Sequence, residues 1–224
     1  MQKYLSLLHV YGGFFSLGLF WLPVLLKKGS RWHKKTGIVF SVAMCFVIAT
    51  AFYFSIHHLI NREYPVGLGF LFLSVISSKT LLDGFTAARL KNDLHRTKSM
   101  MRILDVCIAL LSVVMLAAGA MLSSYFLLAL SGIGLLLVSR WRKNSDRNWK
   151  QRHYTGMIFS GVAAYTAFFV IGYNTFFGGT SFDSQGFTLL RWMLPALFGV
   201  FGVRYLNKQS GGRKNASPDT RQKA

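Results

Sequence analysis

Charged residues are scarce in this sequence. Asp, Glu, Lys and Arg make up 15% of the 224 residues, and only 7 of the charged residues are acidic. Because a soluble domain usually has about a quarter charged residues, the chain has little polar surface for a water-soluble protein. Hydrophobic residues reach 52%, with 20 Phe, 9 Tyr and 5 Trp, which is typical of lipid-facing helices with aromatic residues at the membrane interfaces.

Cysteines and catalytic motifs are also lacking. The 2 cysteines, Cys45 and Cys107, each lie within an apolar run, so we interpret them as small buried hydrophobic residues and not as a disulfide pair. The sequence contains no nucleophile elbow, phosphate loop, zinc motif or paired glycosidase carboxylates. These absences weigh against a hydrolase or a kinase, and they leave the question of an enzyme open while favouring a role that is not enzymatic.

Seven apolar segments are predicted to cross a membrane as helices. Crossing about 30 Å of hydrocarbon at 1.5 Å per residue requires roughly 20 apolar residues. The run 103–138 contains one charged residue, Asp105, and would be on the order of 54 Å long as a single helix, so it is predicted to fold back at Ser123 and Ser124. The predicted fold class is therefore all-α, a polytopic integral membrane bundle of about seven helices. The predicted spans are 4–26, 36–56, 66–88, 103–122, 125–138, 154–177 and 187–203.

The positions of the basic residues predict the orientation. The formal net charge is +19, and most of the 26 Lys and Arg lie in four stretches that share one side if seven helices alternate. Because basic residues resist translocation, we expect the N-terminus outside and the C-terminus inside a bacterial cytoplasmic membrane. Clustering between long uncharged runs argues against nucleic acid as a partner and favours the anionic lipid head groups of the bilayer. The four stretches are 27–35, 89–102, 140–152 and 204–224.

One domain and a tail are predicted. Residues 1–206 form the transmembrane domain, and the polar, basic segment 207–224 is predicted to be a disordered cytoplasmic tail. The first span ends at Lys27 and Lys28 without a small-residue cleavage site, so it is predicted to be a retained helix. A short pattern, Thr-Gly-x-x-Phe-Ser, occurs at 36–41 and again at 155–160. This echo suits a parallel repeat of helices one to three in helices five to seven, and chance or shared helix-entry chemistry explains it equally well.

Motifs near both ends of the chain occur in a characteristic order. This combination resembles a bacterial family of predicted membrane proteins known as domain of unknown function twenty-three-oh-six, and the resemblance covers nearly the whole chain. It implies a multi-pass architecture without an assigned activity, and it marks His9, His33 with Gly37, and His153 with Met157. Tyr173 departs from the family pattern, which has an apolar residue before Asn174. The motifs that carry the resemblance are 8–13, 28–37, 153–157, 165–170, Asn174 and 192–195.

Histidines on the outer side are the first candidate ligands. His9 lies about two turns into the first helix, where a polar residue is a functional candidate or bonds to a neighbouring helix. His57 and His58 follow the second span on the same side. Three imidazoles at similar depth can bind a metal, but adjacent histidines rarely point the same way, and no metal site is predicted.

His33 and His153 are expected at the basic entrances of two helices. Helix N-termini with basic neighbours attract phosphate, so the expected partner is an anionic lipid head group or an anionic ligand. A haem held by both residues requires facing helices at matching depth, and the sequence places the two histidines only at matching depth. No cofactor is therefore predicted, and haem is the alternative.

Lys79 and Asp83 are the only oppositely charged pair within one predicted span. Their spacing of four residues places them on one helix face, so we expect an ion pair that points into the bundle. Asn174 is a further intramembrane polar candidate. The sequence thus predicts small-molecule or ion handling within the bundle. The alternatives are a haem-containing redox protein, or a structural or regulatory subunit that binds partner helices or further copies of itself.

Overall fold

The structure, a computed structural model, describes residues 2–91, 93–143, 148–169 and 185–215. Within these ranges it is helical with no strand, which confirms the predicted all-α fold class. Seven long helices fit the predicted segments. They are α1 (Gln2–Leu25), α2 (Arg31–Ile60), α3 (Tyr64–Leu90), α4 (Lys98–Met121), α5 (Tyr125–Lys143), α6 (Trp149–Ala167) and α8 (Gln185–Asn215), with the short 3-10 helix η1 (Leu94–Thr97) before α4.

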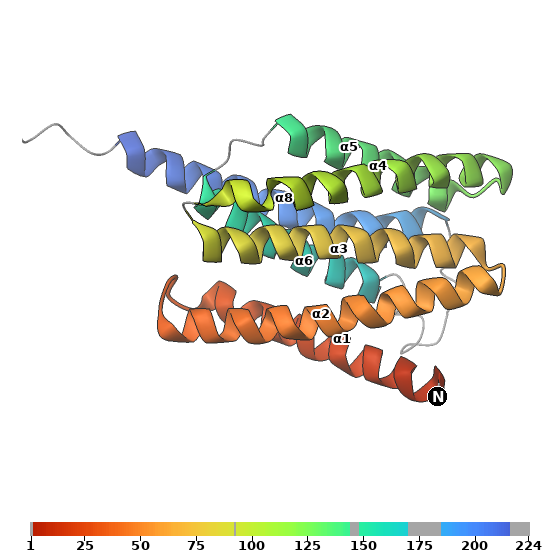
Figure 1. The fold of residues 1–224 in the computed structure, drawn as a ribbon, viewed down its shortest axis with the longest axis horizontal. Helices are drawn as coiled ribbons and strands as arrows, with labels where there is room; N and C mark the ends of the chain where they lie inside the picture. The colour runs from red at the N-terminus through yellow and green to blue at the C-terminus, as the bar shows by residue number, and fades with distance from the viewer. Residues whose placement is uncertain (1, 92, 144–147, 170–184, 216–224) are drawn as a thin grey trace, which may run out of the picture.

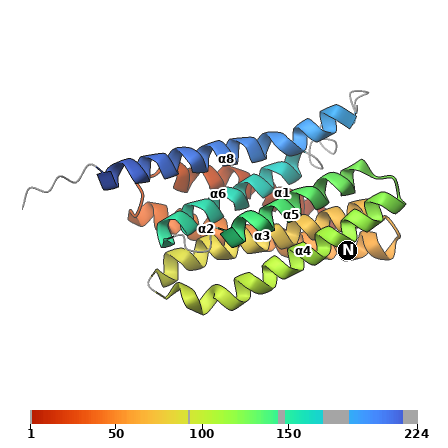
Figure 2. The same cartoon turned by 90° about the horizontal axis from the view of Figure 1, so that it is seen from above.

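The helices lie roughly along one long axis and alternate in direction (Figures 1 and 2). Helix α3 is central, because it packs against α2, α4, α5 and α6. Helix α1 packs on α2, α5 on α4, and α8 on α6. The parallel repeat that the sequence echo suggested stays a prediction, because α6 packs on α8 as α2 packs on α3, whereas α1 packs on α2 and α5 packs on α4.

Local sequence signals account for the ends of the helices. Ser30 begins α2, where its hydroxyl accepts a hydrogen bond from the His33 amide at 3.1 Å, and Asn148 begins α6 by the same kind of cap. Gly29 has a φ of 81° in the connection between α1 and α2, a backbone conformation that favours glycine. Ser123 and Ser124 separate α4 from α5, which confirms the predicted fold-back.

Two apolar clusters fill the interior on either side of α3. Phe40, Met44, Ile48 and Leu81 join α2 to α3. The other cluster joins α3 to α4 and α5, and its buried members are Leu68, Phe72, Ile76, Ile108, Met115, Leu127, Leu130 and Val138.

The outer faces of the bundle are strongly apolar. In the described part of the chain, 4 helical stretches are long and apolar enough to cross a membrane: α1, α2, α3 and Leu94–Met121, while α5 has a shorter apolar stretch. Large hydrophobic side chains such as Leu110, Phe198 and Phe201 are exposed on these faces. Cys45 and Cys107 are free and also exposed, so the prediction that they are buried is wrong. Both lie on outward-facing sides of otherwise apolar helices.

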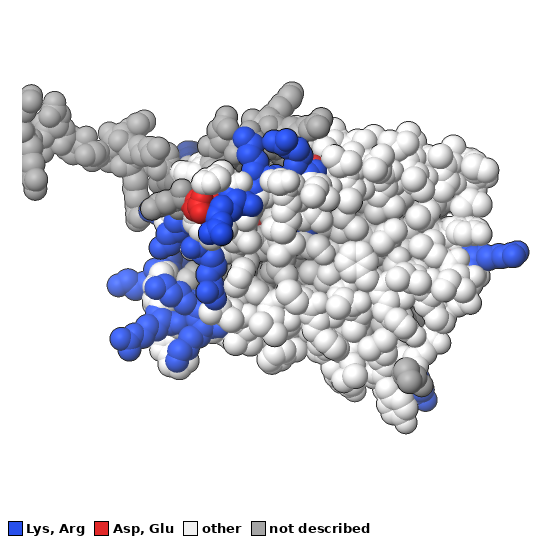
Figure 3. Space-filling model, in the orientation of Figure 1, with Lys and Arg blue, Asp and Glu red and all other residues white. Residues whose placement is uncertain are grey.

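Most Lys and Arg side chains gather at one end of the bundle (Figure 3). We call this the basic end and define it by residues 26–35, 89–91, 93–102, 148–152 and 204–208. Helix α8 continues to Asn215, so the first part of the segment predicted to be a disordered tail is helical. The remainder, 216–224, lies outside the described residues, as does the end of the predicted span 154–177.

Candidate functional site

Helices α3 and α6 cross at two glycines near the basic end. A Cβ atom at Gly84 would lie 2.7 Å from the backbone nitrogen of Met157, and one at Gly156 would meet the backbone of α3 at Gly84 and Thr80. Only residues without a side chain let the two backbones approach this closely. The crossing therefore fixes which residues of α6 face which residues of α3.

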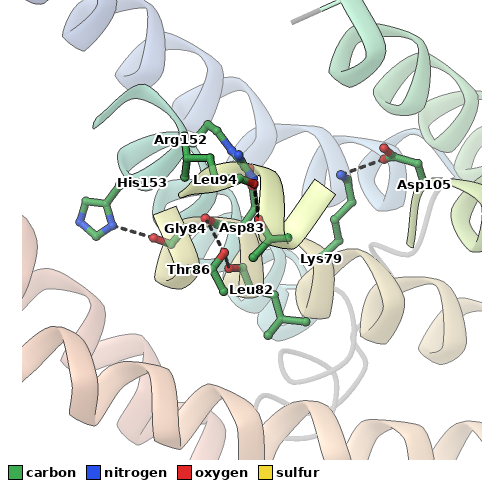
Figure 4. Close-up of polar contacts among 10 residues, drawn as sticks. Lys79, Leu82, Asp83, Gly84, Thr86, Leu94, Asp105, Arg152 and His153 are labelled. Atoms are coloured by element: carbon green, nitrogen blue, oxygen red, sulfur yellow. Dashed lines mark hydrogen bonds and ion pairs between the residues drawn. The ribbon is translucent and has the colours of Figure 1, made fainter. Parts of the chain in front are cut away.

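Asp83 forms an ion pair with Arg152 across this crossing (Figure 4). The Arg152 Nε donates a hydrogen bond to Asp83 Oδ1 at 3.0 Å, and the guanidinium Nη2 donates to the same oxygen. The Arg152 side chain is 15% exposed and the Asp83 side chain is 26% exposed, so water still reaches the pair.

Lys79 pairs with Asp105 of α4 instead of Asp83 (Figure 4). The Lys79 ammonium lies 2.8 Å from Asp105 Oδ1, and the two side chains are only 7% and 16% exposed. The predicted ion pair between Lys79 and Asp83 is therefore wrong, although both residues lie on α3. Each charge found its partner on a different neighbouring helix, because α4 and α6 approach different sides of α3.

Two buried oxygens lie on the helices that face α3. Asp105 Oδ1, on α4, has the Lys79 ammonium 2.8 Å away as its partner, and the ion pair compensates its charge. The hydroxyl of Thr155, on α6, is buried and has no hydrogen-bond partner among the described residues. Native structures contain few such hydroxyls, and each calls for a physical explanation.

His33 and His153 meet at the basic end, which the sequence did not predict. His33 is in the first turn of α2, and His153 is in the first turns of α6. Their ring centroids are 6.3 Å apart, with ring planes at 79°. His33 Nδ1 lies 2.9 Å from the carbonyl oxygen of Pro23, and His153 Nδ1 lies 2.8 Å from that of Gly84.

A lysine lies beside His33. Lys28, in the connection before α2, donates from its ammonium to the carbonyl oxygens of Pro23 and Val24 at 2.9 and 2.5 Å. Burial lowers the pKa of Lys28. His33 precedes the apolar segment of α2, and burial also lowers its pKa, assisted by the charges of Lys28 and His153 and opposed by the hydrogen bond to Pro23.

The remaining sequence candidates lie elsewhere. His9 Nδ1 is 2.6 Å from the hydroxyl of Thr50 on α2, and its ring packs edge-on against Phe54. Because Thr50 already donates its proton to carbonyl oxygens of its own helix, His9 is the donor in this contact. The arrangement joins α1 to α2 as an ordinary interhelical hydrogen bond.

His57 and His58 do not assemble with His9. His57 contacts the side-chain amide of Asn61, and His58 pairs with Glu63 at the end opposite the basic end. In the described ranges, no group of three His, Cys, Asp or Glu side chains is arranged to hold a metal. Asn174 lies outside the described residues.

Sequence reasoning missed two residues of the site. Asp105 was visible as the single charge in the run 103–138, and an isolated charge in a membrane segment is itself a signal of an interior partner. Arg152 gave no comparable signal, because it is one of several basic residues in its stretch.

Comparisons with known proteins add nothing to this geometry: no family model matches the chain, and no curated protein or solved structure is significantly similar to it. The resemblance noted in the sequence stays a prediction.

Proposed function

We propose that the chain spans a bacterial cytoplasmic membrane seven times, with the N-terminus outside and the C-terminus inside. The collection of Lys and Arg at one end of the bundle supports this orientation, since basic residues are retained on the cytoplasmic side. Exposed apolar side chains along the outer faces support insertion, because soluble monomers rarely expose such broad apolar patches.

Aromatic side chains at the basic end support contact with anionic lipid head groups. Trp32 is exposed in the first turn of α2, and the Lys35 ammonium lies 5.6 Å from its ring centroid. Trp149 has Lys91 and Lys150 over its ring in the same way. Tryptophan with adjacent lysine is typical of the membrane–water interface, where the lysine reaches phosphate.

Within this membrane bundle, we propose that the protein conducts protons or small ions at the charged face of α3. The observation that carries the proposal is the Lys79–Asp105 pair, almost fully buried between apolar helices. Lys79 and Asp83 stand one turn apart, so the charged pairs form two successive steps inward from the basic end, first Arg152–Asp83 and then Lys79–Asp105.

A purely structural pair is the competing explanation. Buried ion pairs stabilise little compared with apolar residues of the same volume, so packing alone does not require these charges. Ionisable groups within membrane segments most often mark ion or proton pathways. The Asp105 side chain is a carboxylate, a group that can bind and release a proton.

Proton flux into proteoliposomes tests this function. The purified chain is reconstituted with a pH-sensitive dye inside, and a potassium diffusion potential drives protons inward. Wild-type protein is expected to acidify the lumen faster than empty liposomes. Asp105→Asn keeps the shape but cannot titrate in the physiological range, so its flux should fall to the empty-liposome rate.

Asp93→Asn is the matched control for this substitution. Asp93 is an acidic residue in the connection before η1, where its side chain is 39% exposed, and its replacement should leave the flux unchanged. A wild-type flux equal to that of empty liposomes, tested with both proton and alkali-cation gradients, would show that the charged pairs only join helices.

Reporter fusions test the orientation separately. A fusion after Ala224 should report the cytoplasm. A reporter inserted at Arg62, in the turn between α2 and α3, should report the outer side. If both report the same side, the number of crossings between them is wrong by an odd number.

A further inference from the structure

The pair of His33 and His153 has a feature that ion conduction along α3 does not explain: both imidazoles are fixed in the same tautomer. A carbonyl oxygen can only accept a hydrogen bond, so the Nδ1 atoms facing Pro23 O and Gly84 O must both carry a proton. In each neutral ring the lone pair is then on Nε2. Within the described ranges, neither Nε2 takes part in a hydrogen bond.

The fold supplies these two carbonyl oxygens for different reasons. Pro23 belongs to the last turn of α1, where carbonyl groups have no partner within the helix. Gly84 lies inside α3, and its carbonyl is reachable only because the glycine crossing brings α6 against the α3 backbone. A carbonyl oxygen of α1 thus fixes the orientation of the His33 ring, and a carbonyl oxygen of α3 fixes that of the His153 ring.

This is the arrangement found around metal-binding histidines. A ligating imidazole usually donates its other N–H to a carbonyl or carboxylate, which fixes the ring and makes the free nitrogen more basic. The separation also fits. With each Nε2 about 2.0 Å from a shared ion, and each ring centroid about 1 Å further away, a linear two-ligand site needs centroids about 6 Å apart. The observed separation is 6.3 Å.

Charge and ligand number select the ion. Zinc sites in proteins almost always take four ligands, and the described residues offer no third His, Cys, Asp or Glu to this pair. Monovalent copper is satisfied by two nitrogen ligands in a line. The nearby Lys28 ammonium repels a divalent cation more strongly than a monovalent one.

We propose that His33 Nε2 and His153 Nε2 bind one Cu⁺ ion at the basic end, between the first turns of α2 and α6. Both histidines are half-buried at the basic end, so the ion would exchange with the compartment on that side. The proposal is independent of conduction along α3, because it uses neither Lys79 nor Asp105.

Binding of Cu⁺ to the purified, detergent-solubilised protein tests the proposal. Under anaerobic conditions with a reductant, the chain competes for Cu⁺ with a coloured chelator such as bicinchoninate. We expect one equivalent of Cu⁺ per chain. His33→Asn and His153→Asn should each weaken binding at least about 100-fold, because asparagine keeps a donor near the Nδ1 position but has no counterpart of Nε2.

The asparagine variants separate binding from folding. Since each retains a donor for its carbonyl, its thermal stability without copper should stay close to that of the wild type. His95→Asn is the matched control: His95 lies at the same end, its side chain is 81% exposed, and its loss should leave the equivalent of Cu⁺ in place.

Three results would overturn the site. Absence of Cu⁺ binding by the wild type is one, and undiminished binding by both asparagine variants is another, since it would show adventitious copper. The third is a stoichiometric Soret band after addition of haem that both variants lose, which would assign the histidines to haem.

Discussion

The two faces of α3 hold their neighbours by different means. Toward α6, glycines bring the backbones together, and Asp83, Gly84 and their α6 partners form polar contacts that water still reaches. Toward α4, ordinary apolar side chains form the interface, and one nearly buried ion pair crosses it. The first face depends on the absence of side chains, and the second on mutual neutralisation of two charges. The same helix should therefore be sensitive to added volume on one side and to unbalanced charge on the other.

The largest effect is expected from Asp105→Leu, which breaks the α4 side of the comparison. It removes the carboxylate that pairs with the buried Lys79 ammonium, and removing one member of a buried pair destabilises by about 3–5 kcal/mol. Folded yield and thermal stability in mild detergent measure the loss. The double variant Lys79→Met with Asp105→Leu should recover most of the yield. If it does not, the charges hold α3 and α4 together in a way that apolar packing cannot replace.

Gly156→Leu breaks the α6 side. The new side chain would meet the α3 backbone at Gly84 and Thr80, which cannot move aside, so we expect destabilisation of about 3 kcal/mol. Gly37→Leu is the matched control. Gly37 is the counterpart of Gly156 in the Thr-Gly-x-x-Phe-Ser echo, but a Cβ there meets nothing within 4 Å. Equal stability of the two leucine variants, measured by thermal unfolding in detergent, would contradict the close crossing.

Asp83→Asn sharpens the comparison by removing charge from the glycine side. Arg152 keeps access to water near the basic end, so its loss of a partner should destabilise by only about 1 kcal/mol. The losses of stability caused by Asp83→Asn and by Asp105→Leu are measured in the same detergent. Their ratio tests whether the loss of a charged partner costs more stability when the ion pair is more deeply buried. A destabilisation as large as that of Asp105→Leu would place the Arg152–Asp83 pair in an equally dry environment.

Thr50→Val supplies the baseline for an uncharged interhelical contact. It removes the acceptor of His9 Nδ1 between α1 and α2, and such hydrogen bonds contribute about 0.6 kcal/mol in membrane bundles. The thermal midpoint should shift by the smallest amount in this series. A shift larger than that of Asp83→Asn would show that His9 holds α1 more firmly than an ordinary hydrogen bond does.

Much of the fold was predictable because hydropathy is a local property. The helices occupy the predicted apolar segments, and the fold-back at Ser123 and Ser124 follows from a run too long for one crossing. The prediction for Lys79 and Asp83 was wrong for an equally physical reason. A spacing of four residues puts two side chains on one helix face, but it does not show whether an oppositely charged residue on a neighbouring helix lies closer.

The sequence by itself determined the helices and the gathering of basic residues into a few stretches, because both depend on residues close together in the chain. Only the tertiary structure decided that Lys79 faces Asp105, that Asp83 faces Arg152 and that His33 meets His153. These pairings depend on which helix faces are in contact and on how far the helices are shifted along their axes relative to one another. For α3 and α6, the close approach at Gly84 and Gly156 determines both the contacting faces and the shift, through backbone contacts between residues far apart in the sequence.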